Sequence, residues 1–301
     1  MGSCVTVCKP NLSKNERNLA GTLDNDEIHL NLDKALSSLK SKQSSNPNIS
    51  SPQNNINSGR KTMPPIASED GSQYNGQWKN GLRDGYGIMI WQDGSKYEGD
   101  WKENKIHGKG KLTHSDGDVY EGELENDMAN GFGVYTQVNN AVYEGFWKND
   151  KQNGIGKEKW PDGTEFEGEY LNGLREGKGF LKMRDGSTYE GEFKKNTLYG
   201  MGTYKWADGK SYEGEWANGK MHGTGTLKWP DNRKYTGGFR NDKKHGEGEF
   251  VWSNGSKYNG TWDNGKQHGK GIYIKLSGES KKGEWIQGKR VRWLDCETNE
   301  E

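Results

Sequence analysis

The chain has 301 residues, with 43 Lys and Arg against 43 Asp and Glu, and only 29% of its residues are hydrophobic. Zero net charge provides no long-range field to steer the chain onto nucleic acid. No apolar run approaches the roughly 20 residues that span a bilayer. Three cysteines are too few for a disulfide framework or a zinc ligand set. Low hydrophobicity alone suggests disorder, but 45 Gly and 33 aromatic residues, 12 of them Trp, favour an ordered structure that uses glycine and aromatic rings together.

The N-terminus carries a lipidation motif. Residues 1–6 (MGSCVT) fit the N-myristoylation pattern, in which Gly2 becomes terminal and a hydroxyl residue follows four positions later. Cys4 and Cys8 lie beside it as sites for palmitoylation, because one acyl chain holds a membrane only marginally without a second signal. No apolar segment of a secretory signal is present. Residues 1–23 are therefore predicted to be a lipid-anchor tail; the alternative is an ordinary terminus that happens to begin Met-Gly-Ser.

Two further segments precede the glycine-rich part of the chain. Residues 24–40 are predicted to form a helix, because they open with the capping and first-turn residues Asp-Asn-Asp-Glu and continue with apolar residues at helical spacing. Residues 41–73 are predicted to be a disordered linker, because most of this stretch is rich in Ser, Asn and Gln and lacks aromatic residues.

From Tyr74 onward the sequence repeats every 23 residues without insertion. Glycine fills the third, twelfth and fourteenth places of all nine full units, and the fifth place is aromatic in all but one. A tenth, degenerate unit keeps Gly283 and Trp285, so the array covers residues 74–290, and 291–301 remain as a C-terminal tail. The first place is aromatic in every full unit: Tyr74, Tyr97, Tyr120, Tyr143, Phe166, Tyr189, Tyr212, Tyr235 and Tyr258.

Each unit is predicted to be two short strands, since its aromatic residues and glycines alternate with a period of two. Asn-Gly or Asn-Asp pairs at places seven and eight suit a two-residue hairpin turn, and Asp-Gly after place eighteen suits a three-residue loop. With these turns, Tyr74 is expected opposite Gly87, and Trp91 opposite Tyr97. The result is a continuous antiparallel meander.

Aromatic rings and glycines are expected to share one face of this sheet, each ring covering a gap left by a glycine. The other face carries second-place glutamates: Glu98, Glu121, Glu144, Glu167, Glu190 and Glu213. Lysines are expected opposite or near them as cross-strand partners: Lys109, Lys178, Lys111, Lys157, Lys159, Lys182 and Lys205. Such pairing accounts for the balanced charge without a partner molecule.

The unit Tyr-Glu-Gly-x-Trp-x-Asn-Gly-x-x-His-Gly-x-Gly, as in residues 212–225 (YEGEWANGKMHGTG), closely resembles the MORN (membrane occupation and recognition nexus) repeat. The resemblance covers residues 74–290; the third repeat departs from it by lacking the Trp, and the fifth by beginning with Phe166. It implies an all-β fold, an elongated, twisted, single-layer antiparallel β-meander of stacked hairpins, that serves as a non-catalytic scaffold.

Catalytic, metal and cofactor sites are not expected. Three segments, 214–220, 260–266 and 283–289, match G-x-x-x-x-G-K, but none continues with Ser or Thr or lies between a strand and a helix, so each is a predicted hairpin turn. Four histidines share the eleventh place, but His107 is five repeats from His222, which excludes a common metal site. They are expected to pair with the fourth place, as Asp100 with His107 and Glu215 with His222.

The aromatic face remains as a candidate groove for a helix or peptide of a protein partner, since a single-layer sheet has no second layer to cover it; the alternative is that the rings cover only the sheet. The candidate groove residues are Tyr74, Trp78, Trp91, Tyr97, Trp101, Tyr143, Trp147, Trp160, Trp206, Tyr212, Trp216, Trp229, Trp252, Tyr258 and Trp262.

Three functional hypotheses follow. The first is a cytoplasmic scaffold held on the inner face of a membrane by Gly2, Cys4 and Cys8 and binding a protein partner. The second, from the resemblance, is a ciliary or cytoskeletal component like the MORN proteins of radial-spoke heads. The third is a regulatory relative of phosphatidylinositol phosphate kinases without a kinase domain. Contact with phospholipid headgroups and a homodimer are further expectations; binding of nucleic acid is not expected.

Overall fold

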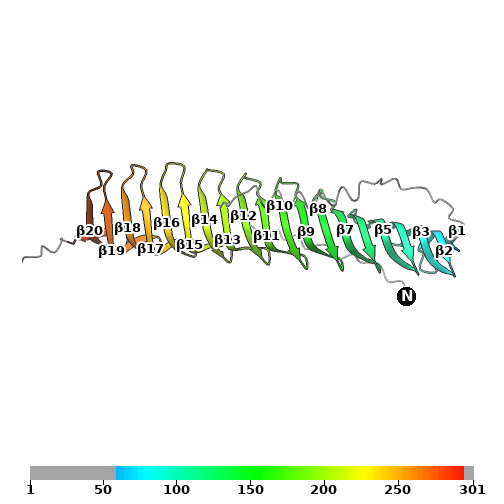
Figure 1. Cartoon of the computed structure of the whole chain (residues 1–301). Coiled ribbons are helices and arrows are strands. Elements are labelled where there is room, and N and C mark those ends of the chain that lie inside the picture. Colours follow the sequence, from blue (N-terminus) through cyan, green and yellow to red (C-terminus); the bar gives the residue numbers. More distant parts are fainter. Residues whose placement is uncertain (1–58, 295–301) are drawn as a thin grey trace, which may run out of the picture. The chain divides into compact units, whose positions relative to one another are not determined.

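A computed structural model of the chain describes residues 59–294. These residues contain 21 β-strands, joined by turns, and no helix. They fall into two compact units, whose described parts are residues 59–174 and 175–294. In each unit, consecutive strands pair antiparallel and the hairpins follow one another in chain order within a single layer (Figure 1). The predicted all-β meander of hairpins is therefore confirmed within the described part of the chain.

The first unit begins with a lone edge strand and continues with alternating strands of seven and nine residues. These strands are β1 (Lys61–Ala67), β2 (Gln73–Lys79), β3 (Leu82–Ile90), β4 (Lys96–Lys102), β5 (Lys105–Thr113), β6 (Val119–Glu125), β7 (Met128–Thr136), β8 (Val142–Lys148), β9 (Lys151–Lys159) and β10 (Glu165–Leu171).

The second unit repeats the same alternation and ends in a short strand. Its strands are β11 (Leu174–Lys182), β12 (Thr188–Lys194), β13 (Thr197–Lys205), β14 (Ser211–Ala217), β15 (Lys220–Lys228), β16 (Lys234–Arg240), β17 (Lys243–Val251), β18 (Lys257–Asp263), β19 (Lys266–Ile274), β20 (Ser280–Ile286) and β21 (Lys289–Trp293).

Both predicted turns are present. Asn80 and Gly81 form a two-residue turn between β2 and β3, with φ of 51° and 77°, which the mirror-image hairpin turn requires. At the other end of β3, Gly94 has φ of 87° and its N–H donates to the Trp91 carbonyl at 3.0 Å. The three G-x-x-x-x-G-K segments contain turns of the first kind between paired strands, so the prediction that they are hairpin turns is confirmed.

The predicted register is wrong by two residues. Tyr74 lies opposite Met89 and not opposite Gly87, whose partner is Gly76. Met89 in turn lies opposite Tyr97, and the Trp91 N–H bonds the carbonyl that follows the three-residue loop. First-place aromatic residues therefore face the sixteenth place, and third-place glycines face the fourteenth.

A bulge beside the two-residue turn causes the shift of Tyr74 from Gly87 to Met89. Between the pairs Trp78–Arg83 and Gly76–Gly87, two more residues lie on β3 than on β2. Gly85 in this stretch has φ of 105°, and the fourth-place side chain of Gln77 accepts a hydrogen bond from the Tyr86 N–H at 2.9 Å. The extra residues thus increase the twist locally, while a side chain satisfies the backbone that the ladder leaves unpaired.

Rings and glycines share one face, as predicted. A Cβ on Gly225 would lie 2.5 Å from two atoms of the Tyr212 ring and hydroxyl, and one on Gly214 would lie 2.5 Å from the Gly225 Cα. The ring therefore lies flat over a pair of facing glycines, and any larger residue at either position would displace it.

The opposite face carries the charged pairs, with the partners moved by the new register. Lys111 lies opposite Glu121, with Nζ 3.5 Å from the carboxylate, and Lys157 lies opposite Glu167 at 2.7 Å. Lys109 faces fourth-place Glu123 and not a second-place glutamate. The Lys111–Glu121 pair is exposed, so its contribution to stability is small, whereas Glu167 is buried.

Two predicted boundaries require correction. Strand β1 lies inside the segment predicted as a linker, where Pro64 and Pro65 are tolerated because they lie at a bulge of this edge strand, between the paired Met63 and Ile66. Strand β21 extends the array to Trp293, past the predicted start of the C-terminal tail. The predicted helix over 24–40 and the lipid-anchor tail lie outside the described residues.

Candidate binding surfaces

The first and fifth places build a buried aromatic ladder within each unit. The Tyr212 ring packs edge-on against Trp216 at 5.1 Å and against Phe239 of the next repeat at 5.0 Å. Its hydroxyl donates to the Glu215 carbonyl at 3.0 Å, and the Trp216 Nε1–H donates to the Gly202 carbonyl at 3.0 Å. Both polar tips are therefore satisfied by backbone.

Burial strongly raises the pKa of these tyrosines. The pKa of Tyr74 and of Tyr258 rises to about 12, in both cases chiefly because burial disfavours the phenolate. The pKa of Tyr212 is raised further for the same reason, with the Glu215 carboxylate as a smaller cause. The tyrosines of the ladder are therefore neutral phenols, which donate hydrogen bonds through their hydroxyl groups.

Most of the predicted groove residues belong to this ladder and cannot contact a partner directly. Nine are buried: Tyr74, Tyr97, Trp101, Tyr143, Trp147, Tyr212, Trp216, Tyr258 and Trp262. Six keep part of their surface exposed: Trp78, Trp91, Trp160, Trp206, Trp229 and Trp252. Five of these six occupy the eighteenth place, so the surface available for binding is the edge of the aromatic face where the three-residue loops begin.

Three eighteenth-place tryptophans follow one another in the second unit. Trp206 packs against Tyr204 at 4.7 Å, and Trp229 packs against Phe250 at 5.8 Å. Trp252 contacts Phe250 at 5.0 Å. We refer to Trp206, Trp229 and Trp252 as the tryptophan row.

A lysine enclosed by aromatic rings lies next to this row and was not predicted from the sequence. The Lys244 Nζ is 4.2 Å from the Trp262 ring centre, 4.5 Å from Phe250 and 5.9 Å from Trp229. Burial, with Arg233 as a second cause, lowers the pKa of Lys244 to about 8. Its tenth place holds Arg, Gln or an apolar residue in the other repeats, so the repeat pattern carries no signal for it.

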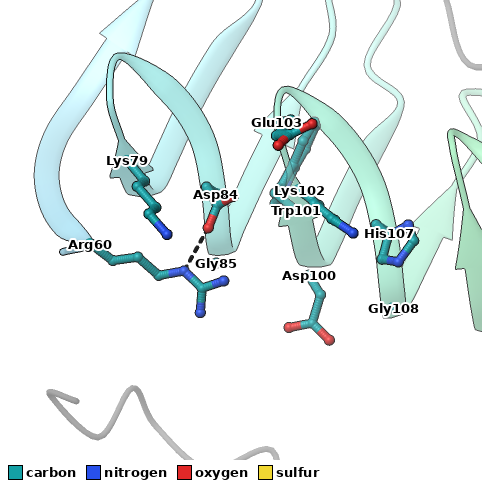
Figure 2. A pocket seen from close by; sticks show the side chains of 10 residues that line it. All are labelled: Arg60, Lys79, Asp84, Gly85, Asp100, Trp101, Lys102, Glu103, His107 and Gly108. Carbon is teal, nitrogen blue, oxygen red and sulfur yellow. Dashed lines mark hydrogen bonds and ion pairs between the residues drawn. The ribbon is translucent and has the colours of Figure 1, made fainter. Parts of the chain in front are cut away.

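The first unit contains a polar cleft of about 510 Å³ (Figure 2). The Arg60 Nε bonds the Asp84 carboxylate at 2.6 Å, and the Asp100 carboxylate accepts from the Lys109 N–H at 3.1 Å. His107 also lines the cleft. Both aspartates thus hold a partner within the described residues, and Glu103 is a third carboxylate lining the cleft.

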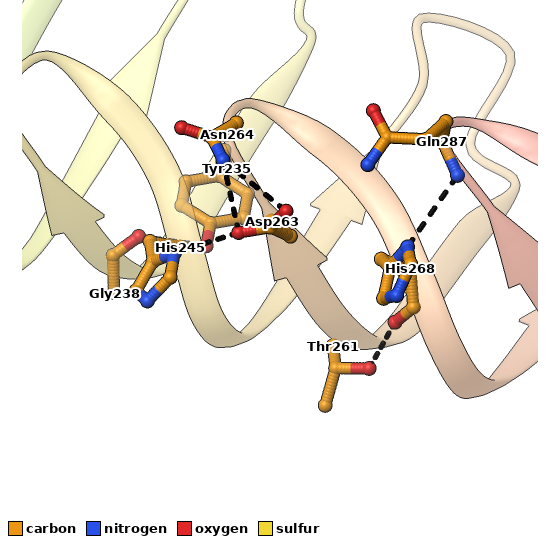
Figure 3. Close-up of polar contacts among 8 residues, drawn as sticks. All are labelled: Tyr235, Gly238, His245, Thr261, Asp263, Asn264, His268 and Gln287. Atoms are coloured by element: carbon orange, nitrogen blue, oxygen red, sulfur yellow. Dashed lines mark hydrogen bonds and ion pairs between the residues drawn. The ribbon is translucent and has the colours of Figure 1, made fainter.

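Two of the four eleventh-place histidines, His245 and His268, contact the next repeat (Figure 3). The His245 Nδ1 lies 3.5 Å from the Asp263 carboxylate, and the His268 Nδ1 accepts from the Gln287 N–H at 3.5 Å. Within residues 59–294, the predicted polar pairs Asp100–His107 and Glu215–His222 form no hydrogen bond, because the fourth-place carboxylates accept from backbone N–H groups at the bulge. Glu215 instead accepts from the Thr224 N–H at 2.8 Å and retains only a weak electrostatic interaction with His222.

Across residues 59–294, no group of three or more His, Cys, Asp or Glu side chains is placed to hold a metal ion. In the same range, no helix has the length and apolarity needed to span a membrane. Gly2, Cys4 and Cys8 lie outside these residues, so lipidation stays a prediction.

Comparison with known proteins identifies the repeat. The family model described as MORN repeat matches nine consecutive segments, which are 74–96, 97–119, 120–142, 143–165, 166–188, 189–211, 212–232, 235–257 and 258–279. The comparison with curated proteins gives no significant match.

Three solved structures that match this chain share little sequence with it. The TCP10 domain of Danio rerio CPAP, as the E1021V mutant, is 10% identical, with 78% of this chain and 100% of that one covered and a TM-score of 0.35. The Drosophila melanogaster SAS-4 TCP domain, in complex with a proline-rich motif of Ana2, is 14% identical, with 63% and 96% covered and a TM-score of 0.29. A streptogramin B lyase is 12% identical, with 77% and 84% covered and a TM-score of 0.16.

Proposed function

Because this chain belongs to the MORN-repeat family, we propose that it is a non-catalytic scaffold that is tethered to the cytoplasmic face of a membrane and presents the exposed edge of its aromatic face to a protein partner. Its repeats are a non-catalytic framework, and the tether and the partner surface are the two functional parts.

The observation that carries this proposal is how the repeat uses its polar and aromatic groups. First-place hydroxyls, fifth-place indoles and fourth-place carboxylates bond backbone groups of the sheet, as Tyr212, Trp216 and Glu215 do. Groups that could do chemistry are thus committed to holding the fold. Half-exposed rings of the eighteenth place are left over, and exposed aromatic surface of this kind is typical of protein-binding sites.

The tether rests on the N-terminal motif. Gly2 is in the position for myristoylation and Cys4 and Cys8 are in position for palmitoylation. Two acyl signals hold a protein on a membrane stably where one does not. Residues 41–58 lie between the predicted helix and the described repeats, and they would serve as a linker that lets the array extend away from the anchor.

Flotation of the full chain with membranes from eukaryotic cells tests the tether. We expect the wild-type protein to float and to carry myristate on Gly2 by mass spectrometry, Gly2→Ala to stay soluble, and Cys4→Ser with Cys8→Ser to float weakly. Cys296→Ser is the matched control, since it removes the only other cysteine and should float as wild type.

An unmodified or acetylated Gly2 in a soluble fraction would refute the tether. A Gly2→Ala variant that keeps its location on detergent-insoluble cytoskeleton or in the cilium would favour the ciliary or cytoskeletal hypothesis instead. Phosphorylation of a phosphoinositide by the purified chain would refute the non-catalytic assignment.

A further inference from the structure

The tryptophan row differs from every other set of aromatic residues in the described repeats. Its three indoles occupy the same place of consecutive repeats, and the row ends at Met183 on one side and Lys275 on the other. Each indole is half-exposed. None of their Nε1–H groups donates to a protein acceptor within residues 59–294, whereas Trp216 and Trp262 donate to glycine carbonyls. The row therefore offers apolar faces and free donors together.

The spacing of the row fits one kind of peptide. Equivalent residues of consecutive repeats are two strands apart, which is about 9.6 Å at the usual strand separation. A polyproline II helix has three residues per turn and rises about 3.1 Å per residue, so equivalent side chains recur every ~9.3 Å. The mismatch is about 0.3 Å per step, whereas a heptad-spaced α-helix recurs every ~10.5 Å, about 0.9 Å too long at each step.

The hydrogen-bonding needs of such a peptide also match. A polyproline II helix has no internal hydrogen bonds, so its carbonyl groups are free acceptors. Indole N–H groups that face solvent can donate to these carbonyls while proline rings pack on the indole faces, the arrangement by which aromatic-lined grooves bind proline-rich segments.

Charge beside the row favours an acidic peptide. The Lys210 Nζ lies 3.8 Å from the Trp206 ring centre, and the Lys244 Nζ lies among the rings next to Trp229. Neither ammonium forms an ion pair within the described residues. Arg233 beside Trp229 is already paired with Asp231 at 2.7 Å. Two cations without a carboxylate partner would attract acidic side chains between the prolines.

We propose that Trp206, Trp229 and Trp252 bind an acidic, proline-rich segment of a protein partner in the polyproline II conformation, with a proline near each indole at every third residue. This rests on the proposed scaffold function, because it names the chemistry of the partner that the scaffold would bind.

Peptide titration of the purified full chain tests the proposal. The probe is an acetylated and amidated Pro-Ala-Glu repeat of about 12 residues, some 37 Å when extended as polyproline II. Two controls are a peptide of the same composition with its prolines adjacent and a Pro-Ala-Lys repeat. We expect both controls to bind at least about tenfold more weakly, and we expect the indole N–H resonances of the row to shift in NMR spectra of the protein as the probe is added.

Matched variants locate the site. Trp229→Ala should weaken binding of the probe by about tenfold or more, as loss of a central aromatic anchor does. Tyr199→Ala should bind as wild type, because Tyr199 is an exposed ring that does not belong to the row. Circular dichroism of each variant separates loss of binding from loss of fold, and the peptide comparison on the wild-type protein needs no variant.

Several results would overturn the proposal: no binding of the probe, equal binding of the probe and the clustered-proline control, equal binding by Trp229→Ala, or an amphipathic helical peptide that shifts the row in place of the probe. Flotation of the wild type and release of Gly2→Ala depend only on the tether. A failed peptide titration with intact flotation would therefore reject this inference and leave the tethered scaffold standing.

Discussion

The buried ladder and the tryptophan row are made of the same residue types, yet they lie in opposite environments. Tyr212 is 0% exposed and Trp216 is 2% exposed, while Trp206, Trp229 and Trp252 keep part of their surface in solvent. The difference follows from their neighbours. Ladder rings lie over glycines and the next repeat's ring, whereas row rings begin a loop at the edge of the sheet.

The polar tips of the rings separate the two regions more clearly than exposure does. In the ladder, the Tyr212 hydroxyl and the indoles of Trp101, Trp147, Trp216 and Trp262 bond backbone carbonyls, whereas the Trp78 indole is an exception. In the row, no indole N–H bonds a protein group in the described repeats. Aromatic residues whose polar tips are satisfied internally stabilise the array, and those whose tips face solvent are available for recognition.

Alkaline pH should break the ladder first and with the largest effect. An unfolded tyrosine has a pKa near 10, and burial raises the pKa of Tyr74 and Tyr258 to about 12. Burial also raises the pKa of the first-place tyrosines Tyr97, Tyr120, Tyr143, Tyr189, Tyr212 and Tyr235. A raised folded pKa means that stability is intact below pH 10 and is lost as pH rises from 10 toward 12, because only the unfolded state loses its protons there. The array should unfold cooperatively in this window.

Absorbance at 295 nm and circular dichroism, recorded together, check this. Tyrosine ionisation should lag behind that of the denatured protein and then coincide with loss of the circular dichroism signal. Gradual ionisation of most tyrosines near pH 10 with an unchanged signal would contradict the buried ladder.

Truncation of one tryptophan side chain in each region should give the second-largest difference between the ladder and the row. Trp216→Ala leaves a cavity in the ladder and an unpaired Gly202 carbonyl, so the free energy of unfolding should fall by about 4 kcal/mol. Trp206→Ala removes a half-exposed ring and should cost about 1 kcal/mol. Urea unfolding of both variants measures the difference, and equal losses would mean that the eighteenth place supports the fold as much as the fifth.

Glycine substitutions test the close contact on which the ladder depends. Gly225→Ala would place a methyl group against the Tyr212 ring, and displacement of that ring should cost about 3 kcal/mol. Gly219→Ala is the matched control in the same repeat: its φ of 72° is strained for alanine but its nearest neighbour is 3.5 Å away, so about 1 kcal/mol is expected. Thermal unfolding of both variants measures these losses, and equal losses would contradict the close contact between Gly225 and the Tyr212 ring.

Much of this comparison could be predicted from the sequence, because a repeat reveals which places share a face. The 23-residue period, the turns at Asn80-Gly81 and Gly94 and the common face of Tyr and Gly all follow from residue types with strong local preferences. The register could not be predicted, because the bulge at Gly85 adds two residues to β3. The only sequence feature that marks this bulge is Gly85 itself, a glycine that the turns do not require.

The repeat pattern also could not predict which aromatic rings are buried and which are exposed. The sequence indicates that Tyr212 and Trp229 lie on one face, but not that the first covers a glycine pair while the second stands at the edge, because that depends on the register. Lys244 was missed for a related reason: its tenth place varies from repeat to repeat, and only the packed structure shows that aromatic rings surround it. Strand β1 has none of the repeat's residues and pairs only because an edge is open to it.

The smallest predicted effect concerns one hydroxyl. Tyr212→Phe keeps the ring over the glycines but leaves the Glu215 carbonyl, 3.0 Å from the present hydroxyl, without that donor. A net hydrogen bond contributes about 1 kcal/mol, so urea unfolding should show a loss of this size. Tyr273→Phe is the control, because the half-exposed Tyr273 hydroxyl bonds no group among residues 59–294, and its loss should change stability by at most a few tenths of a kcal/mol. If Tyr212→Phe were as stable as wild type, ring packing alone would hold the ladder, and the satisfied polar tip would no longer distinguish it from the row.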